Sequence, residues 1–214
     1  MKKIMTIAFT TLFMLVCIVA VSQPKNTEKS DWKLAKKQAK IFKKEGYKVD
    51  GSKPMENMLY DHYRKLHASE SNQEIQGDVI GQTSVKTINQ AQQWSMTNAA
   101  IKYSKQDRIF LRGRIAAEFG AGVAEHPSMD NFYEAYEGLV QKEIRGEVKK
   151  TVGMYKEKKE GGIDYKGFYI VDEEGASNAR IKALEMAFKE SEVARENAEK
   201  ISEFVQKGFE ISDK

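Results

Sequence analysis

Apolar side chains recur every three or four residues over five stretches of the chain, which is the spacing of a helix with one buried face. These stretches are residues 30–45, 54–67, 89–119, 131–148 and 176–208. Three other segments combine β-branched residues with glycine and polar residues, a composition typical of strands. They are residues 74–88, 147–157 and 163–173. This order of elements predicts an α+β fold, with long helices packed on a small, mostly antiparallel sheet.

The first helix has recognisable ends. Ser30 is expected to be the N-cap, and Asp31 suits the positive end of the helix dipole. Gly46 is expected at the left-handed position that follows a helix. The side chain of Tyr47 would then contact Phe42, as in a Schellman cap.

A second helix is expected from Pro54 to about His67, with His62 on its apolar stripe. His62 and His67 are five residues apart, so they do not share a helical face as metal ligands would. His126 precedes Pro127 in a loop. We therefore expect no metal site and assign the three histidines to packing or to the surface.

The longest helical stretch has a less polar side whose small residues would allow close approach to a sheet. Its members are Met96, Ala99, Ala100, Tyr103, Phe110, Gly113, Ala116 and Ala117. A regular four-residue series then predicts one buried stripe: Phe132, Tyr136, Val140, Ile144 and Val148. The last stretch, 176–208, predicts a helix lying on the sheet, with a weak alanine and glycine coiled coil as the alternative.

The strand segments carry turn signals. Gly77 and Gly81 predict a bend or a bulge. No Gly-Lys-Ser or Gly-Lys-Thr triplet is present to form a phosphate loop. The run KKEGG, residues 158–162, predicts the turn of a hairpin, and the segment 163–173 is apolar on both faces, as an interior strand would be.

The amino terminus has the organisation of a secretory signal. Two lysines precede an uncharged apolar run, residues 4–21, and the small residues Ala20 and Ser22 precede Gln23. We expect cleavage between Ser22 and Gln23. The run is also long enough to span a membrane, so an uncleaved anchor is the alternative. Lipidation of Cys17 is disfavoured, because the cysteine lies inside the apolar run and follows bulky residues.

These segments divide the chain into four parts. Residues 1–22 are a signal peptide, 23–30 a flexible lead-in, 31–73 an N-terminal helical appendage and 74–214 the helix-on-sheet domain. The expected location is the periplasm or the cell envelope. Without the leader the chain has no cysteine, so the core must hold the fold without disulfides.

Charge narrows the choice of partners. The chain has 35 Lys and Arg against 31 Asp and Glu, and removing the two leader lysines leaves 33 against 31. Nucleic-acid binding requires a basic field of one sign, so we expect no nucleic-acid partner. One strongly charged surface is nevertheless expected on the first helix, opposite its apolar stripe. It consists of Lys36, Lys37, Lys40, Lys43 and Lys44. Such a face binds phospholipid headgroups or cell-wall polymer, or it is the solvated side of an ordinary amphipathic helix.

No residue pattern of a known chemistry is found. The sequence has no Gly-x-Ser-x-Gly elbow, HExxH pair, CxxC pair or EF-hand loop, so we expect no catalytic residue and no cofactor. The acidic run 172–175 can bind calcium loosely, but a helix N-terminus already explains its charge. Acidic residues are abundant, so the sequence does not exclude a pair of carboxylates that would hydrolyse a glycoside. Four aromatic residues can stack on sugars, although their helical spacing favours core packing: Trp94, Tyr103, Tyr133 and Tyr136.

Three motifs carry a resemblance. They are WKLAKKQAKIFKKEGYKV, KPMENMLYDHY and the run that begins GDVIGQTSVKTINQAQQW. Their order resembles a group of uncharacterised exported proteins of Bacteroidetes-type bacteria. The later part, with YKGFYIVD before a helix, is similar to small envelope lipoproteins of the flagellar-accessory type. The resemblance implies an exported envelope protein with no established activity, although this chain lacks the lipidation site of the lipoproteins.

We therefore expect a non-enzymatic periplasmic or envelope protein that binds other envelope proteins through its helical surface. The alternative is a binder of cell-wall glycan or anionic lipid that uses the lysines of the first helix. A third hypothesis is a hydrolase whose carboxylates meet in the fold. No small-molecule substrate is indicated.

Overall fold

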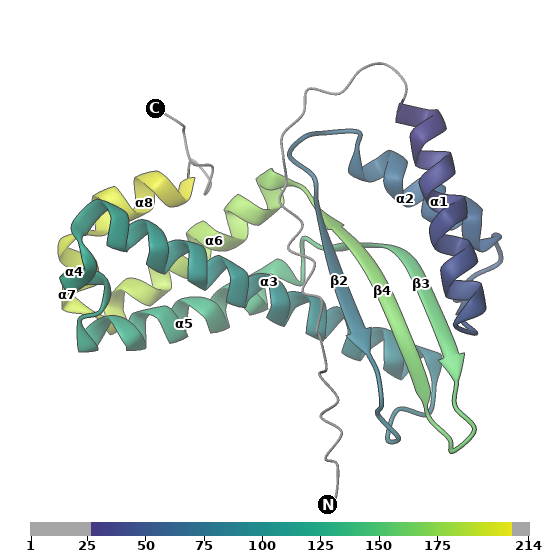
Figure 1. Ribbon diagram of the computed structural model, residues 1–214. Coiled ribbons are helices and arrows are strands. Elements are labelled where there is room, and N and C mark those ends of the chain that lie inside the picture. Colours follow the sequence, from purple (N-terminus) through teal and green to yellow (C-terminus); the bar gives the residue numbers. More distant parts are fainter. Residues whose placement is uncertain (1–26, 207–214) are drawn as a thin grey trace, which may run out of the picture.

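The structure, a computed structural model, describes residues 27–206 (Figure 1). The expected cleavage site and Cys17 lie outside the described residues. The elements are α1 (Thr27–Lys44), β1 (Lys48–Val49), α2 (Met55–Leu66), β2 (Gln73–Val79), α3 (Ile88–Phe119), α4 (Ala121–Ala124), α5 (Pro127–Ile144), β3 (Lys149–Glu157), β4 (Ile163–Val171), α6 (Glu173–Ala187), a 3-10 turn (Phe188–Glu190), α7 (Glu192–Glu196) and α8 (Ala198–Gln206).

A four-stranded sheet in the order β1-β3-β4-β2 lies at the centre of one half of the molecule, and all neighbouring strands are antiparallel. The expected hairpin joins β3 to β4, and its turn uses the positive φ angles of Gly161 and Gly162. β4 is an interior strand, as its two apolar faces predicted. The predicted α+β fold with long helices and a small antiparallel sheet is confirmed.

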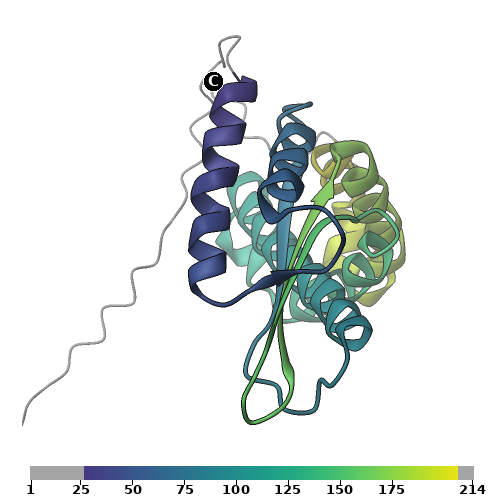
Figure 2. The same ribbon diagram turned by 90° about the vertical axis from the view of Figure 1, so that its right-hand side faces the viewer.

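Helices cover both faces of the sheet. α1 and α2 lie together over one face, as the two views show (Figures 1 and 2). Ala35 and Ala39 of α1 share an apolar cluster with Leu59 of α2 and with Met154 and Phe168 of the sheet. The segment 31–73 is therefore an integral layer of the domain and supplies the edge strand β1, so the interpretation as an appendage was wrong.

The predicted C-terminal end of α1 is confirmed, but its predicted N-terminal end is not. Gly46 has a φ of 87°, and the N–H of Tyr47 donates to the carbonyl of Phe42 at 2.9 Å. The two rings meet edge to face at 6.2 Å, which completes the predicted Schellman cap. The other end was wrong: α1 begins at Thr27 and not after Ser30, so the last four residues of the expected lead-in are helical.

α3 packs on the second face of the sheet and then continues beyond it into a helical lobe formed with α5, α6 and α8 (Figure 1). The buried side of α3 therefore faces the sheet along its first part and the helical lobe along its second part. Over the sheet its buried residues include Ser95 and Ala99, and in the lobe Leu111 and Ile115. Phe110, which was expected on the less polar side, is 48% exposed. The predicted stripe is confirmed over four residues of α5, from Phe132 to Ile144, and Val148 is also buried but lies beyond the end of this helix.

Two glycines allow the close approach of α3 at Ser95: Gly77 of β2 and Gly167 of β4, which are directly paired. Gly153 of β3 pairs with Gly167 and leaves room for the side chains of Tyr165 and Asp50. A Cβ on Gly77 would lie 1.9 Å from the backbone oxygen of Ser95. The hydroxyl of Ser95 donates to the carbonyl of Gly77 at 2.7 Å and contacts the hydroxyl of Tyr169 at 2.9 Å. Gly77 is thus a contact point in regular pairing, and the predicted bend or bulge was wrong there.

The chain after residue 176 is not one helix on the sheet. α6 packs mainly against α5 and α8, and three breaks separate α6, the 3-10 turn, α7 and α8. Ser191 adopts an extended backbone and its hydroxyl accepts the N–H of Ala194 at 3.2 Å, which caps α7. This local hydrogen bond competes with helix continuation. The helix on the sheet and the coiled-coil alternative were both wrong.

Candidate functional site

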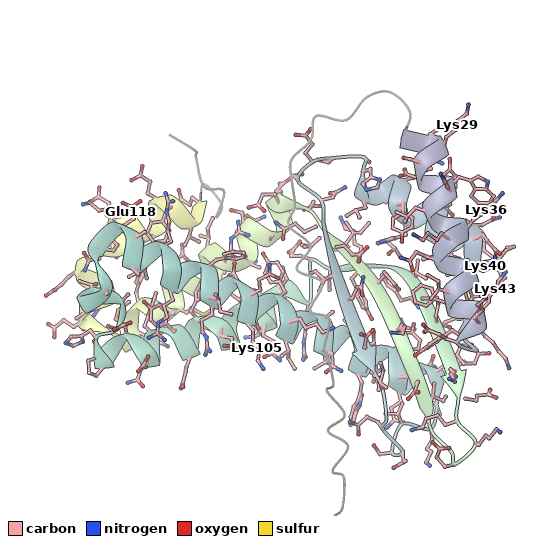
Figure 3. All side chains as sticks on the ribbon, in the orientation of Figure 1. Lys29, Lys36, Lys40, Lys43, Lys105 and Glu118 are labelled. Carbon is pink, nitrogen blue, oxygen red and sulfur yellow. The ribbon has the colours of Figure 1, made fainter. Side chains whose placement is uncertain are left out.

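The outward side of α1 carries seven lysines, which we call the α1 basic surface: Lys29, Lys33, Lys36, Lys37, Lys40, Lys43 and Lys44. All seven are exposed. Of these seven, only Lys43 has a carboxylate of a described residue within 4.0 Å, which is Glu56 at 2.5 Å. This contact lowers the pKa of Glu56. The structure thus brings the five lysines singled out in the sequence onto one surface, together with Lys29 and Lys33. Four of the seven are labelled at the edge of the molecule in Figure 3.

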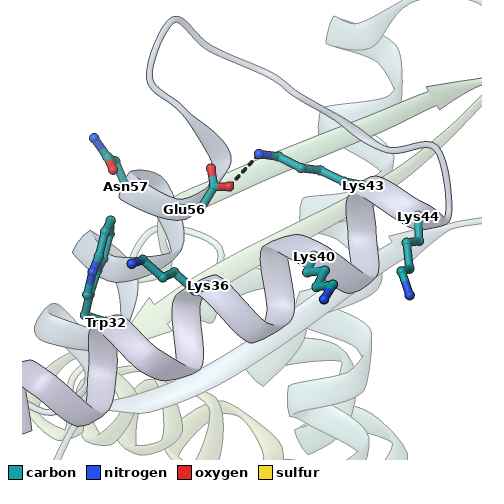
Figure 4. A pocket seen from close by; sticks show the side chains of 7 residues that line it. All are labelled: Trp32, Lys36, Lys40, Lys43, Lys44, Glu56 and Asn57. Atoms are coloured by element: carbon teal, nitrogen blue, oxygen red, sulfur yellow. Dashed lines mark hydrogen bonds and ion pairs between the residues drawn. The ribbon is translucent and has the colours of Figure 1, made fainter.

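A hollow of about 680 Å³ lies between α1 and α2 beside Trp32 (Figure 4). The indole ring meets Tyr60 of α2 edge to face at 5.3 Å, and Lys36 Nζ lies 4.9 Å from the indole centroid. Lys36 and Lys43 extend toward α2, whereas Lys40 and Lys44 point away from it (Figure 4). Since Lys36 and Lys43 already have partners in the hollow, the charge left for a ligand lies on the open, outer side of α1.

Two apolar residues border this outer side. Leu34 and Ile41 are 37% and 40% exposed. Their seven-residue spacing places them on one side of α1, about 10 Å apart along the helix axis. Lys33 and Lys37 are adjacent to that side in the helix. The outer side of α1 therefore combines ammonium groups with an apolar edge.

A buried histidine forms a second polar cluster. His62 is fully buried; its Nδ1 lies 2.7 Å from Thr151 Oγ1 and its Nε2 lies 2.6 Å from Glu74 Oε2. Thr151 is the residue at the register irregularity of β3, which turns its side chain toward α2. Burial tends to raise the pKa of Glu74, but hydrogen bonds from His62 and Gln76 outweigh it and lower this pKa.

The order acid, imidazole and hydroxyl is that of a catalytic triad, but the hydrogen bonds assign a structural role. Thr151 Oγ1 donates its proton to the carbonyl of Phe168 at 2.9 Å, so it accepts from His62 Nδ1. An imidazole that donates to the hydroxyl cannot also take its proton, as general-base catalysis requires. The cluster ties α2 to β2 and β3. The only signal of this cluster in the sequence is the position of His62 on an apolar stripe.

A third polar cluster is buried in the helical lobe. The hydroxyl of Tyr136 donates to Asp107 Oδ2 at 2.7 Å, and Arg180 donates to the hydroxyl of Tyr103 at 3.0 Å and to Glu173. Burial raises the pKa of Asp107 to about 7. The hydrolase hypothesis needs a pair of carboxylates that meet, whereas Asp107 has Tyr136 as its hydrogen-bond partner and Arg180 nearby.

The other predicted candidates have local roles. Asp172 caps α6 by accepting the N–H of Gly175 at 2.8 Å, which lowers the pKa of Asp172. His67 binds Asp31 at 2.8 Å and His126 caps α5. Of the four aromatic candidates for sugar stacking, three are buried and Trp94 is 43% exposed.

Between residues 27 and 206, no three His, Cys, Asp or Glu side chains are grouped so that they can hold a metal ion. No helix in the same range is long and apolar enough to cross a membrane.

Comparison of the chain with known protein families, with curated proteins and with solved structures found no match. The resemblance to exported envelope proteins therefore stays a prediction from the sequence.

Proposed function

We propose that this protein is an exported, non-enzymatic component of the cell envelope that binds an anionic envelope surface through the α1 basic surface. The observation that supports the proposal is the single-sign charge of this surface. Seven lysines lie along 18 residues of helix, and one of them has a carboxylate partner among the described residues. A patch of this kind attracts phosphate or carboxylate groups over about 10 Å at moderate salt.

The other exposed residues give less support to binding of a protein partner through an apolar surface. Three large apolar residues of α3 are exposed: Trp94, Ile109 and Phe110, at 43%, 66% and 48%. Trp94 is fifteen residues from Ile109, or about 22 Å along the helix, and the consecutive residues Ile109 and Phe110 point about 100° apart around the helix axis. Apolar residues that are exposed singly are normal on a protein surface and identify no partner.

The test is co-sedimentation of the chain from Gln23 onward with anionic vesicles and with purified cell wall. In the variant, four lysines on the outer side of α1 become glutamine: Lys33, Lys37, Lys40 and Lys44. Each lysine near an anionic surface contributes about 1 kcal/mol, so the variant should lose about 4 kcal/mol, or on the order of 10³-fold in affinity.

A matched control changes four exposed lysines on other elements to glutamine: Lys105, Lys142, Lys159 and Lys189. It has the same net charge as the variant and should bind as the wild type does. Equal binding by wild type, variant and control, or equal loss in variant and control, would refute the proposal.

A further inference from the structure

We infer that the anionic surface is a phospholipid bilayer, and that Leu34 and Ile41 enter its interfacial region while the neighbouring lysines bind the headgroups. This inference rests on the proposed function and names its partner. Charge alone does not distinguish a bilayer from a hydrated polyanion, because both present anionic groups. The apolar edge of α1 does distinguish them, since only the bilayer has an apolar medium just beneath its charges.

The geometry of α1 suits a location at the interface of a bilayer. Leu34 and Ile41 lie on one side of the helix and are 37% and 40% exposed, although the helix is otherwise anchored to α2 and the sheet. Lys33 and Lys37 are adjacent to that side. A lysine has a four-carbon stem, which can lie along the apolar layer while its ammonium group stays among the phosphates.

The place of α1 in the chain also brings it to a membrane. The apolar run that is expected to enter the membrane during export ends at Val21, and α1 begins at Thr27. The five residues between them extend over at most about 18 Å. The α1 basic surface is therefore delivered next to the bilayer during export, both with cleavage at Ser22 and with a retained anchor.

The inference is tested with the double variant Leu34→Gln/Ile41→Gln, which leaves every lysine in place. Its matched control is Ile80→Gln/Ile109→Gln, which changes two residues that are 54% and 66% exposed elsewhere. The probes are vesicles of phosphatidylglycerol and phosphatidylcholine, vesicles of phosphatidylcholine alone, and soluble inorganic polyphosphate. All proteins start at Gln23, so that the leader cannot insert by itself.

We expect the double variant to bind the anionic vesicles about tenfold more weakly, because burial of the exposed apolar area no longer contributes. Its affinity for polyphosphate should be unchanged, and the control should match the wild type on both probes. Binding of the double variant to anionic vesicles at wild-type strength would overturn the inference. So would wild-type binding to polyphosphate but not to vesicles. In both cases the lysine variant still tests the proposed function, which fails only if neither anionic probe depends on the lysines.

Discussion

The buried carboxyl of Asp107 should make the stability of the protein depend on pH, and its surroundings set the size of this effect. The Asp107 side chain is buried between α3, α5 and α6, where it accepts a hydrogen bond from Tyr136 and faces Arg180, Tyr103 and Glu173. Burial raises the pKa of Asp107 from 3.8 to about 7, and the hydrogen bond from Tyr136 only partly opposes this shift. The folded protein therefore holds a proton on Asp107 at pH values where the unfolded chain has lost it.

This difference makes the folded state less stable as the pH rises. Between about pH 4 and pH 7 the folded state binds more protons than the unfolded state, so the free energy of unfolding falls with pH and then levels off. A shift of one pKa unit corresponds to 1.36 kcal/mol, so the shift of about three units gives a loss of about 4 kcal/mol. The pKa values of Tyr136 and Arg180 are also raised, and these two groups do not titrate in this range.

The test is the substitution Asp107→Asn, because an amide resembles the protonated acid and its oxygen can accept the hydrogen bond from Tyr136. Urea unfolding from pH 4.5 to pH 8.5 should show similar stability of variant and wild type at the acidic end. At pH 8 the variant should be more stable, by up to about 4 kcal/mol. Asp130→Asn, at a side chain that is 66% exposed, is the control and should show no such trend. A pH-independent difference between Asp107→Asn and the wild type would refute the reasoning.

Two further predictions concern the packing of helices on the sheet. Gly77→Ala should destabilise the protein by about 3 kcal/mol or more, because its Cβ would overlap the backbone of α3, whereas Gly113→Ala should stabilise it by about 0.5–1 kcal/mol in thermal melts. A Gly77→Ala protein that melts at the wild-type temperature would exclude the close contact. His62→Ala should cost about 3 kcal/mol in urea unfolding, because it removes the buried imidazole that bonds to both Glu74 and Thr151, while His126→Ala should cost about 1 kcal/mol. Equal effects of the two histidine substitutions would contradict the structural role of His62.

Local signals explain why several elements were predictable from the sequence. The Schellman cap at Gly46 depends on residues within one turn, and the stripe from Phe132 to Ile144 lies on one helix with one buried face. The buried face of α3 was harder to predict because its packing partner changes from sheet to helices. Ala99 faces the sheet side and Leu111 the lobe, so no single stripe describes the whole helix.

The polar clusters were not predictable because their members are far apart in the sequence. His62 and Glu74 are twelve residues apart, and Thr151 follows 89 residues after His62. Asp107 is an acidic residue on the buried face of α3, so it interrupts the apolar periodicity of this helix. The lysines of α1 were predictable because exposure follows from helical phase. The pairing of Lys43 with Glu56 was not, since it requires the placement of α2 against α1.

The α1 basic surface is not explained by the stability of the fold. Its seven lysines form four pairs at four-residue spacing and three pairs at three-residue spacing. Like charges at these spacings destabilise a helix by about 0.2–0.5 kcal/mol per pair, so their mutual repulsion costs about 2 kcal/mol. The ion pair of Lys43 with Glu56 offsets only part of this, because exposed ion pairs contribute about 0–1 kcal/mol. When α1 binds an anionic surface, the negative charges offset the repulsion between the lysines and also attract them. For the same reason, glutamine at positions 33, 37, 40 and 44 should keep or raise the stability of α1. A loss of sedimentation in that variant would then report a lost contact and not an unfolded protein.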